Sequence, residues 1–174
     1  MIDFHSHVLP GVDDGSRSVE ESLAMLEALR TQGVRVVAAT PHFYADSDDP
    51  ARFLARRAAA WTQLRGAMGP ELPRVLLGAE VYYYRGISRS EQICSLCLQG
   101  TDVLLLEMPF HRWDGVMSEE IFRLAEEQDV QVVLAHVDRY LGYAPRGLWK
   151  ELSAFGIRMQ CNADSLLDRR TAGK

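Results

Sequence analysis

The sequence of 174 residues predicts an α/β fold of the TIM-barrel type, with about six strand–helix units. Short apolar runs alternate with segments whose apolar residues recur at helical spacing, which implies parallel strands covered on both faces. Reactive side chains follow the ends of these runs, where barrels of this type carry their functional groups. No internal repeat, low-complexity tract or linker interrupts the pattern, so we expect a single domain over residues 1–174.

The strands are predicted from continuous apolar runs rather than from alternating ones, because strands buried on both faces have few polar positions. They are expected at residues 1–4, 34–40, 75–79, 103–106, 130–135 and 157–161. A histidine or glutamate follows most of these runs within two residues. Parallel strands would therefore bring these side chains together at one rim of the sheet.

The first two helices have clear boundary signals. Ser18 and Glu21 form a capping-box pattern ahead of an apolar stripe, and Gly33 suits the end of that helix. Pro50 suits the first turn of the second helix, whose apolar face continues to Leu64. Both segments lie between predicted strands, as crossover helices must.

Three further helices complete the predicted alternation. One is expected over residues 90–98, from its apolar spacing alone. Ser118 is the expected N-cap of the next, and Pro145 and Gly156 are expected to open and close the last.

Composition and charge exclude several classes of protein. A hydrophobic fraction of 47% with 25% charged residues is ordinary for a globular domain, and a net charge of −5 argues against nucleic-acid binding. No apolar run is long enough to span a membrane, and the start lacks a basic-then-apolar signal pattern. With three cysteines, an odd number, we expect reduced thiols in the cytoplasm.

The groups at the strand ends indicate a metal site. His5 and His7 are two residues apart, so on a strand they share a face and can bind one cation. Taken alone, the pair could equally be two hydrogen-bonded histidines. Glu80, Glu107 and His136 make metal binding the favoured interpretation. Inward-facing carboxylates in apolar runs are unfavourable unless a cation or partner compensates their charge.

Three other residues admit two interpretations each. Asp14 is either a metal ligand or a turn former beside Gly15, and His42 is either a ligand or a polar-loop residue. Arg139 is three residues past His136, where a guanidinium suits an anionic substrate, above all phosphate. The alternative for Arg139 is a surface ion pair with its neighbour Asp138.

The cysteines are not expected to be catalytic. Cys94 and Cys97 form a CxxC pattern in an apolar segment without a second pair, so we interpret both as packing residues. A cysteine-dependent phosphatase needs an arginine six positions after the nucleophile. Counted from the three cysteines, those positions hold Gly100, Val103 and Leu167, which excludes that chemistry.

Several motifs, in order and spacing, resemble the polymerase and histidinol phosphatase (PHP) superfamily. The resemblance is closest to its capsule-locus branch, the manganese-dependent tyrosine-protein phosphatases of the CpsB/YwqE type. The motifs are Met-Ile-Asp-Phe-His-Ser-His, Val-Asp-Asp-Gly-Ser, Ala-Thr-Pro-His-Phe, Gly-Ala-Glu-Val, Leu-Leu-Glu-Met-Pro and Ala-His-Val-Asp-Arg-Tyr. One departure is Val137, where the branch usually has proline.

The resemblance implies a distorted (β/α)7 barrel with up to three metal ions, manganese or another divalent metal such as iron or zinc. It implies that His5, His7 and Glu80 hold the first ion. It implies that Glu80 bridges to a second, held also by Glu107 and His136. Asp14 and His42 would hold a third and, with Arg139 on the phosphate, take part in catalysis.

The resemblance also implies a partner, a phosphotyrosine protein that is a bacterial tyrosine kinase of polysaccharide export. The family has a further strand–helix portion with an Asp-x-His motif, which does not occur after Asn162. We therefore expect an incomplete barrel that lacks this C-terminal portion, with fewer metals, lower turnover and an open edge that favours a homo-oligomer.

Three functions remain open at this point. The first is hydrolysis of protein phosphotyrosine by a metal-dependent phosphatase linked to capsular or exopolysaccharide synthesis. The second keeps the metals but takes a small phosphate monoester, as histidinol-phosphate phosphatases do. The third is a catalytically weak relative that binds a phosphoprotein.

Overall fold

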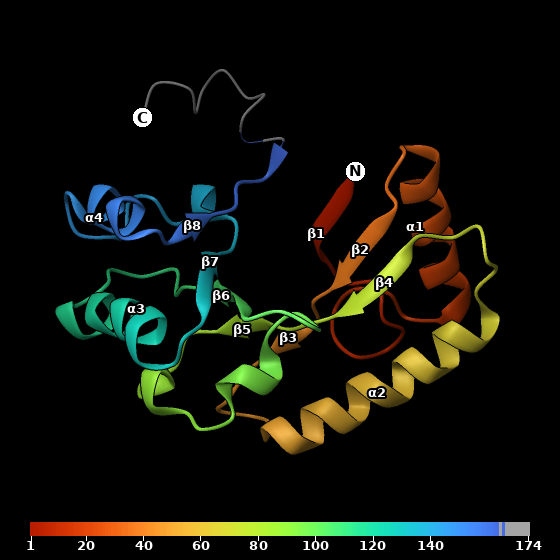
Figure 1. The fold of residues 1–174 in the computed structure, drawn as a ribbon, viewed down its shortest axis with the longest axis horizontal. Helices are drawn as coiled ribbons and strands as arrows, with labels where there is room; N and C mark the ends of the chain where they lie inside the picture. The colour runs from red at the N-terminus through yellow and green to blue at the C-terminus, as the bar shows by residue number, and fades with distance from the viewer. Residues whose placement is uncertain (164, 166–174) are drawn as a thin grey trace.

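All strand pairs in the computed structural model are parallel, and the strands form two sheets (Figure 1). The structure describes residues 1–163 and 165. The first sheet has the order β1 (Ile2–Ser6), β2 (Val36–Ala39), β4 (Arg74–Leu77). The second has the order β3 (His42–Phe43), β5 (Glu80–Tyr82), β6 (Val103–Glu107), β7 (Gln131–Leu134), β8 (Arg158–Met159).

The two sheets arise because two predicted strands are each followed by a short second strand that was not predicted. The predicted run 34–40 contains β2, and β3 begins after Thr40 and Pro41. The predicted run 75–79 contains most of β4, and β5 begins at Glu80 after Gly78 and Ala79. Proline has no N–H to donate, which accounts for the first break. Backbone bonds still cross the breaks, from Gly78 N to Ala39 O at 2.8 Å and from Glu80 N to Pro41 O at 3.0 Å. The predicted α/β class and parallel pairing are confirmed.

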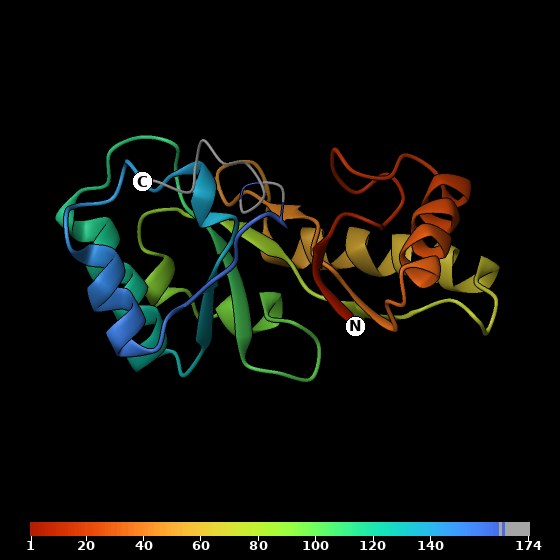
Figure 2. The same ribbon diagram turned by 90° about the horizontal axis from the view of Figure 1, so that it is seen from above.

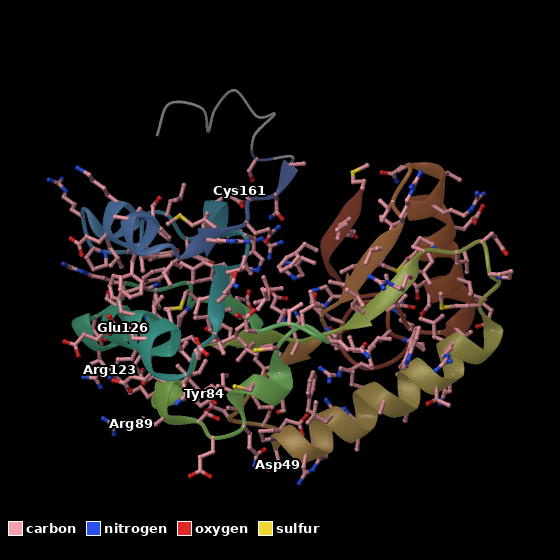
Figure 3. The ribbon with its side chains drawn as sticks, in the orientation of Figure 1. Asp49, Tyr84, Arg89, Arg123, Glu126 and Cys161 are labelled. Carbon is pink, nitrogen blue, oxygen red and sulfur yellow. The ribbon has the colours of Figure 1, made fainter. Side chains whose placement is uncertain are left out.

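The first two helices begin where the sequence predicts. Helix α1 (Val19–Thr31) has Ser18 as its N-cap, and its hydroxyl accepts a bond from Glu21 N at 3.2 Å. Helix α2 (Pro50–Ala67) has proline in its first turn, and Asp49 lies at its start (Figure 3), accepting from Ala51 N at 2.9 Å. The first sheet packs against these helices through a core that includes Leu26, Val37, Leu64 and Val75.

The predicted helix over residues 90–98 is wrong. Two 3₁₀ turns occupy this region, η1 (Ile87–Arg89) and η2 (Ile93–Leu96). Ile93 and Leu96 are buried while the two residues between them are exposed. Such a spacing of three suits a 3₁₀ turn, in which residues i and i+3 share one face.

The last two helices begin at other residues than predicted. Helix α3 (Gly115–Glu127) is capped by Asp114, which accepts from Met117 N at 2.9 Å, and the predicted cap Ser118 lies inside the helix. A carboxylate four residues earlier replaces the hydroxyl in the capping role. Helix α4 (Leu148–Phe155) begins after Pro145, whose carbonyl accepts from Leu148 N at 3.2 Å. Its predicted closure at Gly156 is confirmed.

Helices α3 and α4 cover the second sheet at the end of the molecule opposite α1 (Figure 2). Their buried core includes Leu104, Ile121, Leu134 and Leu152. A smaller cluster lies between the sheets, where Phe4 packs against Leu105 and Val133. None of the helices in the described part of the chain is long and apolar enough to cross a membrane.

Candidate metal centre

The predicted site residues come together where the two sheets meet. His5 lies on β1 and His7 just after it, His42 opens β3, Glu80 opens β5, Glu107 ends β6 and His136 follows β7. All of these except Glu107 line a pocket of about 400 Å³, which is also lined by Asp14 and Arg139. The strand breaks matter here, because they place His42 and Glu80 as neighbours in the β3–β5 register.

Glu80 is the centre of the cluster and is 1% exposed. Its Oε2 lies 3.0 Å from His5 Nε2 and 3.2 Å from His7 Nε2. The same oxygen lies 3.2 Å from His42 Nδ1, and Oε1 lies 2.8 Å from His136 Nε2. Burial opposes ionisation, but hydrogen bonds from His136 and His5 lower the pKa of Glu80 well below its usual range. One buried carboxylate thus faces four imidazoles.

Glu107 forms the second carboxylate of the cluster. Its Oε1 lies 3.3 Å from His136 Nε2, and its Oε2 lies 3.8 Å from His42 Nδ1. Burial lowers the pKa of His136, but hydrogen bonds to Glu107 and Glu80 outweigh it and raise that pKa to about 9. Without a cation, His136 would therefore stay protonated at neutral pH.

The donor set fits divalent metal ions. Three groups have ligand atoms within 4.8 Å of one another: His5 with His7 and Glu80; His7 with Asp14 and His42; His42 with Glu80 and Glu107. The buried Nδ1 atoms of His42 and His136 have no hydrogen-bond partner among the described residues. His42 Nδ1 nevertheless faces Glu80 Oε2, as two ligands of one ion do. Imidazole with carboxylate suits manganese, iron and zinc.

The backbone of His136 is also unusual, because its φ is 29° in a residue that is not glycine. Such conformations are uncommon and need support from the surrounding structure. The side chain of Gln160 provides it, since its Oε1 accepts from His136 N at 2.6 Å. The same Oε1 lies 3.3 Å from His5 Nδ1, which links the end of β8 to β1. A glutamine inside the last predicted strand carries no sequence signal for this role.

Asp13 is a site residue that the sequence reasoning missed. Its Oδ2 lies 2.6 Å from His7 Nδ1 and accepts from His42 N at 2.9 Å. Burial alone would lower the pKa of His7, but hydrogen bonds to Asp13 and Glu80 raise it to about 10. A carboxylate behind a ligand histidine fixes which ring nitrogen faces the metal. The Asp13-Asp14 pair was the available signal, and spacing alone does not distinguish its two members.

Asp14 and Arg139 lie at the open side of the pocket. The Asp14 side chain is 83% exposed, with Oδ1 at 3.7 Å from His42 Nε2. Arg139 is exposed in the turn η3 (Val137–Arg139) and forms no ion pair within the described part of the chain. Asp138 instead accepts from Asn162 N at 2.9 Å and Ser165 Oγ at 2.7 Å. The alternative of an Asp138–Arg139 pair is therefore wrong.

The cysteines lie outside the pocket lining. All three are free, and Cys97 is buried, as its predicted packing role requires. Cys94 is exposed, so the packing interpretation is wrong for that residue.

The fold and the site define the class of this protein: a parallel α/β protein with a histidine–carboxylate cluster at its strand ends whose donor atoms could hold divalent metal. The family model described as "Capsular polysaccharide synthesis, CpsB/CapC" matches residues 1–173, and the chain belongs to this family.

The curated relatives include two proteins named tyrosine-protein phosphatases. YwqE of Bacillus subtilis is 32% identical over 145 residues, which cover 80% of this chain and 55% of YwqE. CpsB of Streptococcus agalactiae is 25% identical over 175 residues, which cover 98% of this chain and 70% of CpsB. This chain therefore spans about half of the first relative and about two thirds of the second.

A solved structure gives the same fold. It belongs to a study of YwqE from Bacillus subtilis and CpsB from Streptococcus pneumoniae, described as unique metal-dependent tyrosine phosphatases. The TM-score is 0.73 at 25% sequence identity, over 95% of this chain and 68% of the solved chain.

Proposed function

We propose that this chain is a metal-dependent phosphatase that hydrolyses protein phosphotyrosine. The observation that carries the proposal is the buried Glu80 among four imidazoles, in a pocket with Arg139 at its open side. The named activities of YwqE and CpsB support it. An exposed guanidinium beside a cationic centre suits a dianionic phosphate ester.

Two of the three proposed ligand sets lie within groups seen in the structure, and the set of Glu80, Glu107 and His136 rests instead on the 2.8 Å and 3.3 Å contacts of His136 Nε2. His5, His7 and Glu80 would hold one ion, and Glu80 would bridge to a second with Glu107 and His136. Asp14 and His42 would hold a third. The proposed metal is manganese, with iron and zinc as alternatives of the same ligand preference.

The chain's own residues would perform distinct parts of the reaction. Divalent ions bound here supply Lewis acidity, which lowers the pKa of water and neutralises charge on a phosphate. Arg139 would bind the phosphate oxygens and stabilise their charge in the transition state. Asp13 would hold His7 in one tautomer, and Asp14 with His42 would close the open side of the site.

We further propose that the two sheets belong to one PHP-type domain over residues 1–174, with the strands arranged as in a distorted (β/α)7 barrel. The packing of Phe4 against Leu105 and Val133 supports a single domain, because it connects β1 of the first sheet to β6 and β7 of the second. The 3.3 Å contact between His5 and Gln160 supports it from the β8 side.

The proposed partner is a phosphotyrosine protein, specifically a tyrosine kinase of polysaccharide export in the bacterial cytoplasm. The family's connection with capsular polysaccharide synthesis supports this choice. A net charge of −5 gives no support for a nucleic-acid partner. Self-association into a homo-oligomer is part of the proposal, because the edges of β1 and β8 lack a strand partner among the described residues.

Phosphate release from a phosphotyrosine peptide tests the proposed activity. We expect turnover with manganese, none in excess chelator, and loss in His136→Ala. His111→Ala is the matched control, because His111 is exposed and lies outside the pocket lining. Serine at Cys94, Cys97 and Cys161 together should leave turnover nearly intact. Activity in excess chelator, or its loss in the serine variant, would overturn the proposal.

The pocket of about 400 Å³ also admits a small phosphate ester, so histidinol phosphate is the comparison substrate. Faster turnover of histidinol phosphate than of the peptide would favour the small-molecule alternative.

A further inference from the structure

Two exposed aromatic rings lie against the histidine cluster. Tyr44 follows β3 and is 41% exposed, and Phe110 follows β6 and is 43% exposed. The Tyr44 ring stacks on His42, with centroids 5.2 Å apart and an interplanar angle of 26°. The Phe110 ring stacks on His136, with centroids 6.3 Å apart and an angle of 10°.

These two rings lie at the ends of a continuous series of ring contacts. Within the cluster, His42 lies 4.7 Å from His7, His7 lies 5.3 Å from His5, and His5 lies 5.7 Å from His136, measured between centroids. One exposed aromatic ring therefore extends the series beyond each terminal histidine.

Both rings are held from behind by other tyrosines. Tyr82 lies 5.6 Å from Tyr44, and the buried Tyr140 meets Phe110 edge-on at 5.9 Å and 69°. The Tyr140 hydroxyl is fixed in turn by a hydrogen bond to Ala135 O. Tyr44 and Phe110 are thus each packed against another tyrosine, while a large part of each ring remains open to solvent.

The depth of the cluster sets what a substrate must reach. Glu80 and His136 are 1% and 3% exposed, whereas Tyr44 and Phe110 are 41% and 43% exposed, so each ring lies nearer the surface than the histidine on which it stacks. A phosphotyrosine carries its phosphate on a rigid phenyl ring. With the phosphate at the histidine–carboxylate cluster, that ring would lie beside Tyr44 and Phe110. A phosphoserine carries its phosphate on a single methylene group, which offers the Tyr44 and Phe110 rings little surface to contact.

We infer that Tyr44 and Phe110 are specificity residues that contact the phenyl ring of phosphotyrosine and favour aryl over alkyl phosphate esters. The inference rests on the proposed phosphatase function and adds the residues that select its substrate. Aromatic contacts of this kind contribute beyond the area they bury, and they require no charge on the substrate ring.

Paired peptides test the inference, one with phosphotyrosine and one with phosphoserine in the same sequence. For Tyr44→Ala and for Phe110→Ala, we expect kcat/KM on phosphotyrosine to fall about 3- to 10-fold, with little change on phosphoserine. Tyr44→Phe and Phe110→Tyr should restore the preference. Phe155→Ala is the control, because Phe155 is equally exposed at 42% and packs on Phe122 of α3 instead.

Two further measurements keep the outcomes distinct. Elemental analysis of each variant should show unchanged metal content, since the rings contact ligand histidines without supplying a ligand atom. Fluorescence anisotropy should measure the binding of both peptides to manganese-loaded protein. The preference for phosphotyrosine over phosphoserine in binding should change in the variants as it does in turnover.

An equal loss on both peptides, or no loss on either, would overturn the inference while leaving the phosphatase proposal intact. Absence of turnover in the unaltered protein would defeat the phosphatase proposal instead. In that case the anisotropy measurement still decides the inference: a preference for phosphotyrosine that both alanine variants reduce supports it, and no such preference overturns it.

Discussion

Asp13 shows how one residue behind a ligand can control a metal centre. It lies 2.6 Å from His7 and also accepts from the backbone of His42. Removing a carboxylate behind a ligand histidine weakens metal binding by about 10- to 100-fold. We expect Asp13→Ala to lower manganese affinity by this amount, measured by competition with a fluorescent chelator. Asp46→Ala, at an exposed position, should leave affinity unchanged. Equal affinities in both variants would show that Asp13 does not orient His7.

Gly15 allows the loop to approach the first ligand strand. A Cβ on Gly15 would lie 2.3 Å from His7 Cβ and 2.4 Å from His7 O, so the loop or β1 would have to move. We expect Gly15→Ala to reduce the free energy of unfolding by about 1–3 kcal/mol in urea titrations. Gly66→Ala is the control, since nothing lies within 4 Å of its Cβ and the position is helical. It should stabilise by about 0.5–1 kcal/mol. Equal effects would contradict the close approach.

Cys97 provides a pH-dependent test of burial. Burial raises its thiol pKa from about 9 to about 12, so at pH 8 only about one molecule in 10⁴ carries the thiolate. We expect iodoacetamide to modify Cys94 but not Cys97 at pH 8. Cys97 should react as the pH approaches 12. Mass spectrometry identifies which cysteine is modified. The folded state favours the neutral thiol. The contribution of Cys97 to the free energy of unfolding is therefore fully present below pH 9 and is lost as the pH rises from 9 to 12. Equal reaction of both cysteines at pH 8 in folded protein would contradict this.

Glu120 shows how a helix fixes the loop that follows β5. From α3, its carboxylate accepts from Tyr83 Oη at 2.5 Å and from Gly86 N at 2.7 Å, and it is 5% exposed. Its removal would leave buried donors without a partner, so we expect Glu120→Ala to cost about 2 kcal/mol of unfolding free energy. Glu126→Ala, exposed on the same helix (Figure 3), should cost less than about 0.5 kcal/mol. A similar loss in both variants in urea titrations would show that the buried contacts contribute little.

At the scale of elements, continuous apolar runs predicted the strands well, because burial on both faces leaves a clear composition. The same pattern did not predict the breaks at Pro41 and Gly78, although these breaks set His42 beside Glu80. Helix starts were predicted where a cap and an apolar stripe coincide, as at Ser18. They were missed where a carboxylate competes with a nearby serine, as at Asp114.

At the scale of the whole molecule, the side chains that cluster at the strand ends could be predicted from the sequence, whereas the residues that support them could not. His5, Glu80 and His136 carry chemistry that is unfavourable at the end of an apolar run unless something compensates it, so sequence alone singles them out. Asp13 and Gln160 act through hydrogen bonds between segments far apart in sequence, such as the 2.6 Å bond from His136 N to Gln160 Oε1. Only the folded chain brings these partners together.

The two sheets also meet at the proposed metal centre, since His5 and His7 come from the first sheet and its end, and the other proposed strand-end ligands come from the second. Bound metal would therefore connect the two halves of the molecule while creating the reactive site. Structure and function would depend on the same ions.

Phosphate release from a phosphotyrosine peptide, recorded while manganese is added back to metal-free protein, tests the central claim most directly. The account predicts that turnover rises in step with bound manganese, saturates when the histidine–glutamate centre is filled, and returns to background in excess chelator. Full turnover by metal-free protein in excess chelator would contradict it.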